Sequence, residues 1–135
     1  MKKVIIAIAV STIFLMMIGV LMFYGALNLL PELMEEYFSP VFRPAGETDW
    51  LFFAHPLVLS IGLKWFWERY KNILKGPLLL RALEVALVYG IVALVPVLWL
   101  TFGAIDISLP MTLTWLVYGM VQAFAAGLVF ARLNP

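Results

Sequence analysis

The sequence lacks cysteine altogether and is poor in charge, with 13% Asp, Glu, Lys and Arg among its 135 residues. Without cysteine, the chain has no disulfide, thiolate metal site, cysteine nucleophile or lipid-modified cysteine anchor. A soluble domain carries about 25% charged and about 45–50% apolar residues, whereas 64% of this chain is hydrophobic. Too little polar surface remains to cover a water-soluble globule, which excludes a soluble enzyme. The composition therefore predicts an integral membrane protein.

Recognisable chemical motifs are also lacking. No basic run with interleaved aromatic residues indicates nucleic-acid binding, and the net charge is only +1. The chain has no glycine-rich phosphate loop, no dinucleotide-binding fingerprint and no G-x-S-x-G serine motif. A single histidine is too few for a His-rich zinc site or for bis-histidine haem ligation. The sequence therefore predicts no cofactor, no metal, no nucleic-acid partner and no enzymatic activity.

Four apolar segments approach the roughly 20 residues that a transmembrane helix needs. They are residues 4–30, 50–67, 78–102 and 109–131, of which the second is short and contains His55, Pro56 and Lys64. The first segment follows two lysines, as a signal peptide does, but it is longer than the signal-peptide apolar core of about 7–15 residues. We therefore expect an all-α, single-domain bundle of four transmembrane helices over residues 1–135.

Charge is distributed unevenly between the loops that join these segments. Arg43 and six acidic residues (Glu32, Glu35, Glu36, Glu47, Asp49 and Asp106) lie on one side of the predicted membrane. The other eight basic residues lie on the opposite side: Lys2, Lys3, Lys64, Arg69, Lys71, Lys75, Arg81 and Arg132. By the positive-inside rule, both termini are expected in the cytoplasm, with the bacterial inner membrane as the location.

Aromatic residues and prolines mark the edges and interruptions of the predicted spans. Trp65, Trp67 and Tyr70 fall where the second span meets the cytoplasmic headgroups, as interfacial anchors do. Pro56 and Pro96 lie inside spans and are expected to kink them.

The long first outer loop is expected to begin with a short helix. Pro31 is suited to a first helical turn, and the segment that follows places Leu33, Met34, Tyr37 and Phe38 on one face. We expect this amphipathic segment to lie at the membrane interface with that face toward lipid.

Two stripes of small residues recur at four-residue spacing on the last two spans. They are Ala82, Ala86 and Gly90 on the third span, and Gly119, Ala123 and Gly127 on the fourth. Such stripes let helix backbones approach closely inside a membrane. Because a short loop joins these two spans, the pattern favours packing of one stripe on the other; use of one stripe as an oligomer interface is the alternative.

Glu84 is the strongest candidate for a functional residue. It lies six residues into the third span, about 9 Å deep, and an ionisable group inside a span is a functional hypothesis by default. Lys64, Arg81 and Gln122 are expected at nearby depths, so the four side chains form a candidate buried polar cluster. This cluster is interpreted either as a functional site, namely a proton or cation relay or a site for an anionic lipid headgroup, or as an Arg81–Glu84 pair at i, i+3 that neutralises itself. The neutral pair is favoured.

His55 is the candidate for a site on the outer side. Glu35, Glu36, Glu47, Asp49 and Asp106 are expected on the same side, but their spacing matches no metal-ligand pattern. A structural histidine is therefore favoured over a ligand.

Three classes of function follow from these features. The favoured class is an accessory or assembly subunit of the bilayer that interacts with lipid, with another membrane protein or with copies of itself. The second is a small oligomeric transporter or channel that uses Glu84, and the third is a membrane enzyme with an outer site around His55.

Overall fold

The structure, a computed structural model, describes residues 1–44, 46 and 48–135, and these residues form helices and connecting turns without any strand. The elements in order are α1 (Lys2–Leu29), α2 (Pro31–Glu36), α3 (Asp49–Tyr70), α4 (Leu78–Tyr89), the π-helical turn η1 (Gly90–Leu94), α5 (Val95–Ala104) and α6 (Leu109–Leu133). The all-helical prediction is confirmed.

Three helices in the described part of the chain are long and apolar enough to cross a membrane: Lys2–Leu29, the continuous helix Leu78–Ala104 and Leu109–Leu133. These three helices support an integral membrane protein. The helix α3 has 22 residues but is not among them; His55, Pro56 and Lys64 lie within it and lower its mean hydropathy. The expected count of four spans is therefore not established by length and composition.

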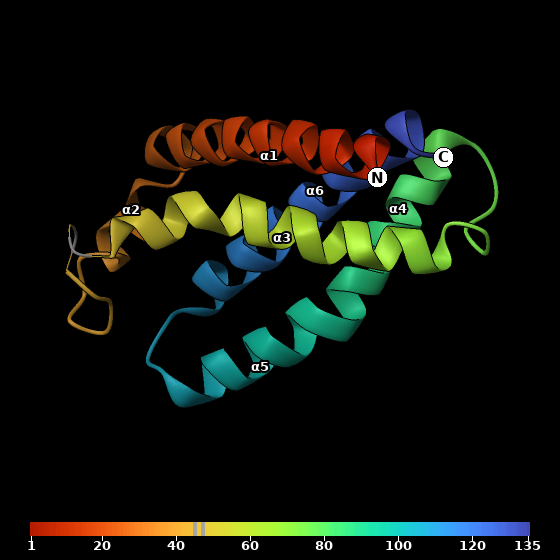
Figure 1. The fold of residues 1–135 in the computed structure, drawn as a ribbon. Coiled ribbons are helices and arrows are strands. Elements are labelled where there is room, and N and C mark those ends of the chain that lie inside the picture. Colours follow the sequence, from red (N-terminus) through yellow and green to blue (C-terminus); the bar gives the residue numbers. More distant parts are fainter. Residues whose placement is uncertain (45, 47) are drawn as a thin grey trace.

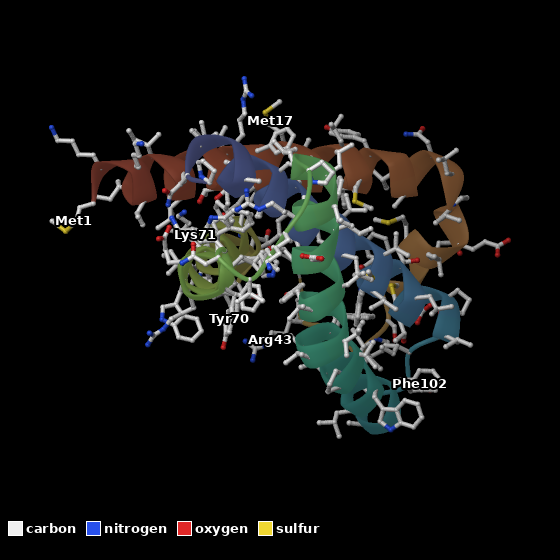
Figure 2. The ribbon with its side chains drawn as sticks, turned by 90° about the vertical axis from the view of Figure 1, so that its right-hand side faces the viewer. Met1, Met17, Arg43, Tyr70, Lys71 and Phe102 are labelled. Carbon is white, nitrogen blue, oxygen red and sulfur yellow. The ribbon has the colours of Figure 1, made fainter. Side chains whose placement is uncertain are left out.

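The helix α6 lies at the centre of the molecule, where α1, α3, α4, η1 and α5 all contact it. Figure 1 shows both termini and the turn between α3 and α4 at one end of the molecule, and α2 at the opposite end. The helices are far from parallel: α1 runs across the view of Figure 2, whereas α4 and α5 run down it. They fan out around α6, and α5 lies apart from α1 and α3 (Figure 1).

The closest helix contact joins α4 and α6 through the two small-residue stripes. A Cβ atom added to Gly127 would lie 2.9 Å from the backbone Cα of Ala82, and one added to Gly119 would lie 2.7 Å from a methyl carbon of Leu94. Gly90 faces Met120 in the same contact. The structure thus places the two stripes against each other. Inside a membrane the hydrophobic effect does not drive helices together, so close packing of small residues has to stabilise such a contact.

The π-helical turn η1 stands where Pro96 was expected to kink the third span. The N–H of Val95 donates to the carbonyl of Gly90, five residues earlier, and Pro96 has no N–H to donate in the next turn. A π-turn takes up an extra residue and rotates the helix face that follows. No residue of α5 is buried, whereas α4 buries Ala82, Val85 and Ala86.

Gly127→Ala tests the α4–α6 contact. The added methyl group would meet backbone that cannot move aside, so we expect the free energy of unfolding to fall by about 1–3 kcal/mol. The measurement is reversible unfolding in mild detergent by titration with sodium dodecyl sulfate.

Gly62→Ala is the matched control for this prediction. Gly62 lies inside α3 with nothing within 4 Å of an added Cβ, so the better helix propensity of alanine should leave stability unchanged or raise it by up to about 1 kcal/mol. Equal effects of the two changes would contradict the close contact.

Candidate functional site

Glu84 lies on the side of α4 that is turned away from α6. It is two residues from both Ala82 and Ala86, which are buried against α6, and two residues correspond to about 200° around a helix. Its side chain is half-buried, and it forms no ion pair within the part of the chain that the structure describes. Glu84 is therefore a carboxylate without an ion pair among the described residues, on the outward face of a helix that is long and apolar enough to cross a membrane.

Arg81 does not neutralise Glu84, although it lies one helical turn before it. The guanidinium carbon of Arg81 lies 4.7 Å from the centroid of the Trp67 ring, so the cation stacks on the aromatic face. Its Nε atom is buried and has no hydrogen-bond partner among the described residues. The Arg81–Glu84 pair that the spacing favours is thus not formed, because Trp67 of α3 holds the guanidinium.

Lys64 is buried inside the protein, with a relative exposure of 1%. Its ammonium nitrogen lies 2.7 Å from Oε1 of Glu68, one turn later on α3, and 5.1 Å from the centroid of the Phe130 ring. A carboxylate and an aromatic face together compensate for the cost of burying this cation.

Trp67 joins α3 to the end of α6. Its Nε1 donates to the backbone oxygen of Asn134 at 2.8 Å, its ring packs 6.2 Å from that of Phe130, and the Asn134 amide donates to Glu68. Trp67 has no exposed surface, so the expectation that it anchors α3 in the headgroups is wrong. Trp65 and Tyr70 are exposed and remain candidates for that role.

We call Lys64, Trp67, Glu68, Arg81 and Phe130 the cation–aromatic cluster. It includes two of the expected polar residues, Lys64 and Arg81, and three residues that sequence reasoning did not connect with them. The i, i+4 spacing of Lys64 and Glu68 is a usable sequence signal for an ion pair. The contacts of Trp67 and Phe130 join distant segments and have no such signal.

Gln122 lies in different surroundings from the other expected polar residues. It is fully buried, its Nε2 donates to the hydroxyl of Tyr118 at 2.8 Å, and its Oε1 has no partner among the described residues. Tyr118 in turn lines a cavity of about 60 Å³ between α1, α3 and α6, together with Met16, Gly19, Val20, Phe52, Phe53 and Pro56. Gln122 therefore belongs to the flank of α6 that faces α1 and α3, and Glu84 lies beyond α4 on the other flank.

His55 is exposed on α3, and the described residues contain no group of His, Asp or Glu that holds a metal ion. Glu47, one of the carboxylates expected near it, lies outside the described residues. Glu36 is engaged elsewhere: its two carboxylate oxygens accept from the backbone N–H of Ser108 at 2.7 Å and from its hydroxyl at 2.6 Å. Ser108 caps α6, because its hydroxyl accepts from the N–H of Met111.

The residues at the end of α2, Glu36 and Tyr37, contact the first turns of α6. The hydroxyl of Tyr37 accepts from Nε1 of Trp115 at 2.6 Å, and burial raises the pKa of the Tyr37 phenol above its ordinary value. Phe38 is 88% exposed. The expected lipid-facing set is thus divided: Phe38 faces outward, whereas Tyr37 contacts α6.

Comparisons with protein-family models, with curated proteins and with solved structures find nothing that matches this chain. The site must therefore be interpreted from its own chemistry.

Substitutions of Lys64 and Glu68 test whether the buried Lys64 cation depends on the Glu68 carboxylate for its stability. Glu68→Gln leaves the Lys64 cation buried without a counter-charge, so we expect stability to fall by about 1–3 kcal/mol. Lys64→Met keeps most of the volume and frees Glu68, which is 35% exposed, to turn to water; a loss below about 1.5 kcal/mol is expected.

Detergent unfolding measures both changes, with Lys75→Met at an exposed lysine as the control, for which a change within about 0.5 kcal/mol is expected. The double variant should lose no more than Lys64→Met alone. A larger loss for Lys64→Met than for Glu68→Gln would show that the buried cation does not depend on Glu68.

Proposed function

We propose that this protein is a non-catalytic integral membrane subunit that works by binding another membrane protein chain through the outward face of α4. The observation that carries the proposal is the unpaired Glu84 on that face. A carboxylate inside a span is costly unless it meets a partner group or water. Since no described residue of its own chain supplies the partner, a neighbouring chain is the natural source.

The placement of Gln122 gives less support to a relay through a single chain. A relay needs polar groups in sequence along one path, but Glu84 and Gln122 lie on opposite sides of the α4–α6 contact. Gln122 is hydrogen-bonded to Tyr118, which lines the cavity between α1, α3 and α6, whereas Glu84 faces outward. A transporter of this kind would have to build its path between several chains.

An outer enzymatic site around His55 has weaker support again. A catalytic site needs an imidazole that converges with other polar groups in a pocket. His55 is exposed, and Glu36 is held by Ser108.

We further propose that α3 is the fourth span and that both termini are cytoplasmic, in a bacterial inner membrane. The antiparallel succession of helices supports this topology, because both termini and the α3–α4 turn share one end of the molecule (Figure 1). That end carries eight of the nine basic residues, with Arg43 as the exception, as the positive-inside rule requires of a cytoplasmic side.

Native mass spectrometry after mild extraction from native membranes tests the proposed function. We expect the wild-type chain to emerge bound to another protein chain, and Glu84→Leu to lower the bound fraction at least about ten-fold, which corresponds to about 1.4 kcal/mol. Glu32→Leu removes the same charge from the exposed start of α2 and should leave the bound fraction unchanged.

Two outcomes would contradict the proposal. A wild-type chain that emerges as a monomer with lipid alone would remove the partner. Ion flux in proteoliposomes that Glu84→Gln abolishes would instead favour the transporter alternative.

A further inference from the structure

The cavity between α1, α3 and α6 is a second site, separate from the face of α4 and from the cation–aromatic cluster. The three helices contact one another pairwise, and Figure 1 shows them side by side. The lining of the cavity is mostly apolar but contains the hydroxyl-bearing Tyr118 of α6 and Pro56 of α3. Each of these two residues brings hydrogen-bonding capacity to the cavity that the protein itself does not use.

Pro56 leaves a backbone acceptor free on α3. The helix continues through Pro56, but proline has no N–H to donate to the carbonyl of Phe52, four residues earlier. Helix carbonyls point along the axis toward the following turn, and Phe52 and Pro56 both line the cavity. The freed carbonyl therefore lies on the face of α3 that borders the cavity, and inside a membrane such a carbonyl needs a protein group or water as its partner.

Tyr118 supplies a donor on the opposite wall. Its hydroxyl accepts from Nε2 of Gln122 at 2.8 Å and donates to no group among the described residues, although a hydroxyl has one hydrogen to donate. Gly19 lets this hydroxyl lie close to α1, because a Cβ atom added to Gly19 would be 3.0 Å from it. Gln122 is fully buried, and its Oε1 also lacks a partner within the described part of the chain.

We propose that the cavity binds ordered water, which accepts from the Tyr118 hydroxyl and donates to the Phe52 carbonyl. A buried water molecule needs at least two polar partners and a space of at least about 10–15 Å³, and the cavity has about 60 Å³. The bound water takes the place of the helical hydrogen bond that Pro56 removes, at little energetic cost relative to a direct bond. This inference goes beyond the proposed function, because it needs no partner chain on α4.

Two neighbouring methionines midway along α1 make the proposal testable. Met16 lines the cavity, whereas Met17 does not and is the more exposed of the two, at 57% against 39%. A short X-ray pulse converts water into hydroxyl radicals, which oxidise the side chains next to that water. For the wild-type chain in lipid nanodiscs, we expect mass spectrometry to find Met16 oxidised at least about five-fold faster than Met17, the reverse of their order of exposure.

A matched pair of glycine substitutions on α1 identifies the source of this oxidation. Gly19→Ala puts a methyl group in front of the Tyr118 hydroxyl, so the Met16 to Met17 oxidation ratio should fall to about one because the water loses its place. Gly25→Ala makes the same change where an added Cβ meets nothing within 4 Å, and it should leave the ratio unchanged.

Pro56→Ala tests the acceptor independently of Gly19. Alanine restores the N–H that the Phe52 carbonyl lacks and is a better helix former than proline, so the substitution removes one partner of the water without weakening α3. We expect a lower oxidation ratio than in the wild type, with circular dichroism confirming that the helix content is kept. This variant decides where Gly19→Ala does not fold.

The outcomes separate this inference from the membrane placement and from the proposed function. Equal, slow oxidation of Met16 and Met17 would overturn the bound water and assign the cavity to an apolar occupant such as a lipid acyl chain. Equal, fast oxidation would show bulk water along α1 and overturn the membrane placement as well. A high ratio that survives both Gly19→Ala and Pro56→Ala would exclude the two named partners. None of these results changes the partner binding that depends on Glu84.

Discussion

The close approach of α4 to α6 is the constraint on which the rest of the structure depends. Gly127 brings the two backbones so near that the small face of α4 has to point inward. Helical geometry then turns the opposite face, with Leu80, Glu84 and Leu87, away from the protein. The outward position of Glu84 is therefore a consequence of packing on the other side of its helix. A single stripe of small residues thus sets both the helix contact and the surface that remains for a partner.

The cation–aromatic cluster joins α3, α4 and α6 at the end of the molecule that carries both termini. Trp67 lies between Arg81 of α4 and Phe130 of α6, and its ring nitrogen holds the residue that follows α6. Three helices are thereby tied together at one point. The cluster also explains why Arg81 is not bound to Glu84: an aromatic face and a carboxylate compete for one guanidinium, and in this chain the aromatic face holds it.

Periodicity and composition predict the helices and the small-residue stripes, because each depends on residues close in sequence. Burial of Trp67 could not be predicted, since its partners Phe130 and Asn134 are more than 60 residues away. Local spacing alone also favoured the Arg81–Glu84 pair, and only the tertiary position of Trp67 decides against it. The π-turn has a sequence signal in Pro96, but a proline inside a span predicts an interruption without specifying its kind.

In the helix α3, the polar side chains are buried and the exposed side chains are apolar, a distinction that mean composition does not register. Its polar residues Ser60 and Lys64 are fully buried against the protein, whereas its exposed positions include Phe52, Val58 and Ile61. A helix whose charged side chain is buried against the protein can present an apolar surface to a bilayer. This holds even where its mean hydropathy is too low for it to be recognised as a span. The ion pair with Glu68 makes the arrangement possible, because a buried lysine without a counter-charge would be too costly. This is the physical basis for the proposal that α3 is the fourth span: α1 and α6 pack against α3, and its polar side chains Ser60 and Lys64 are buried in the protein.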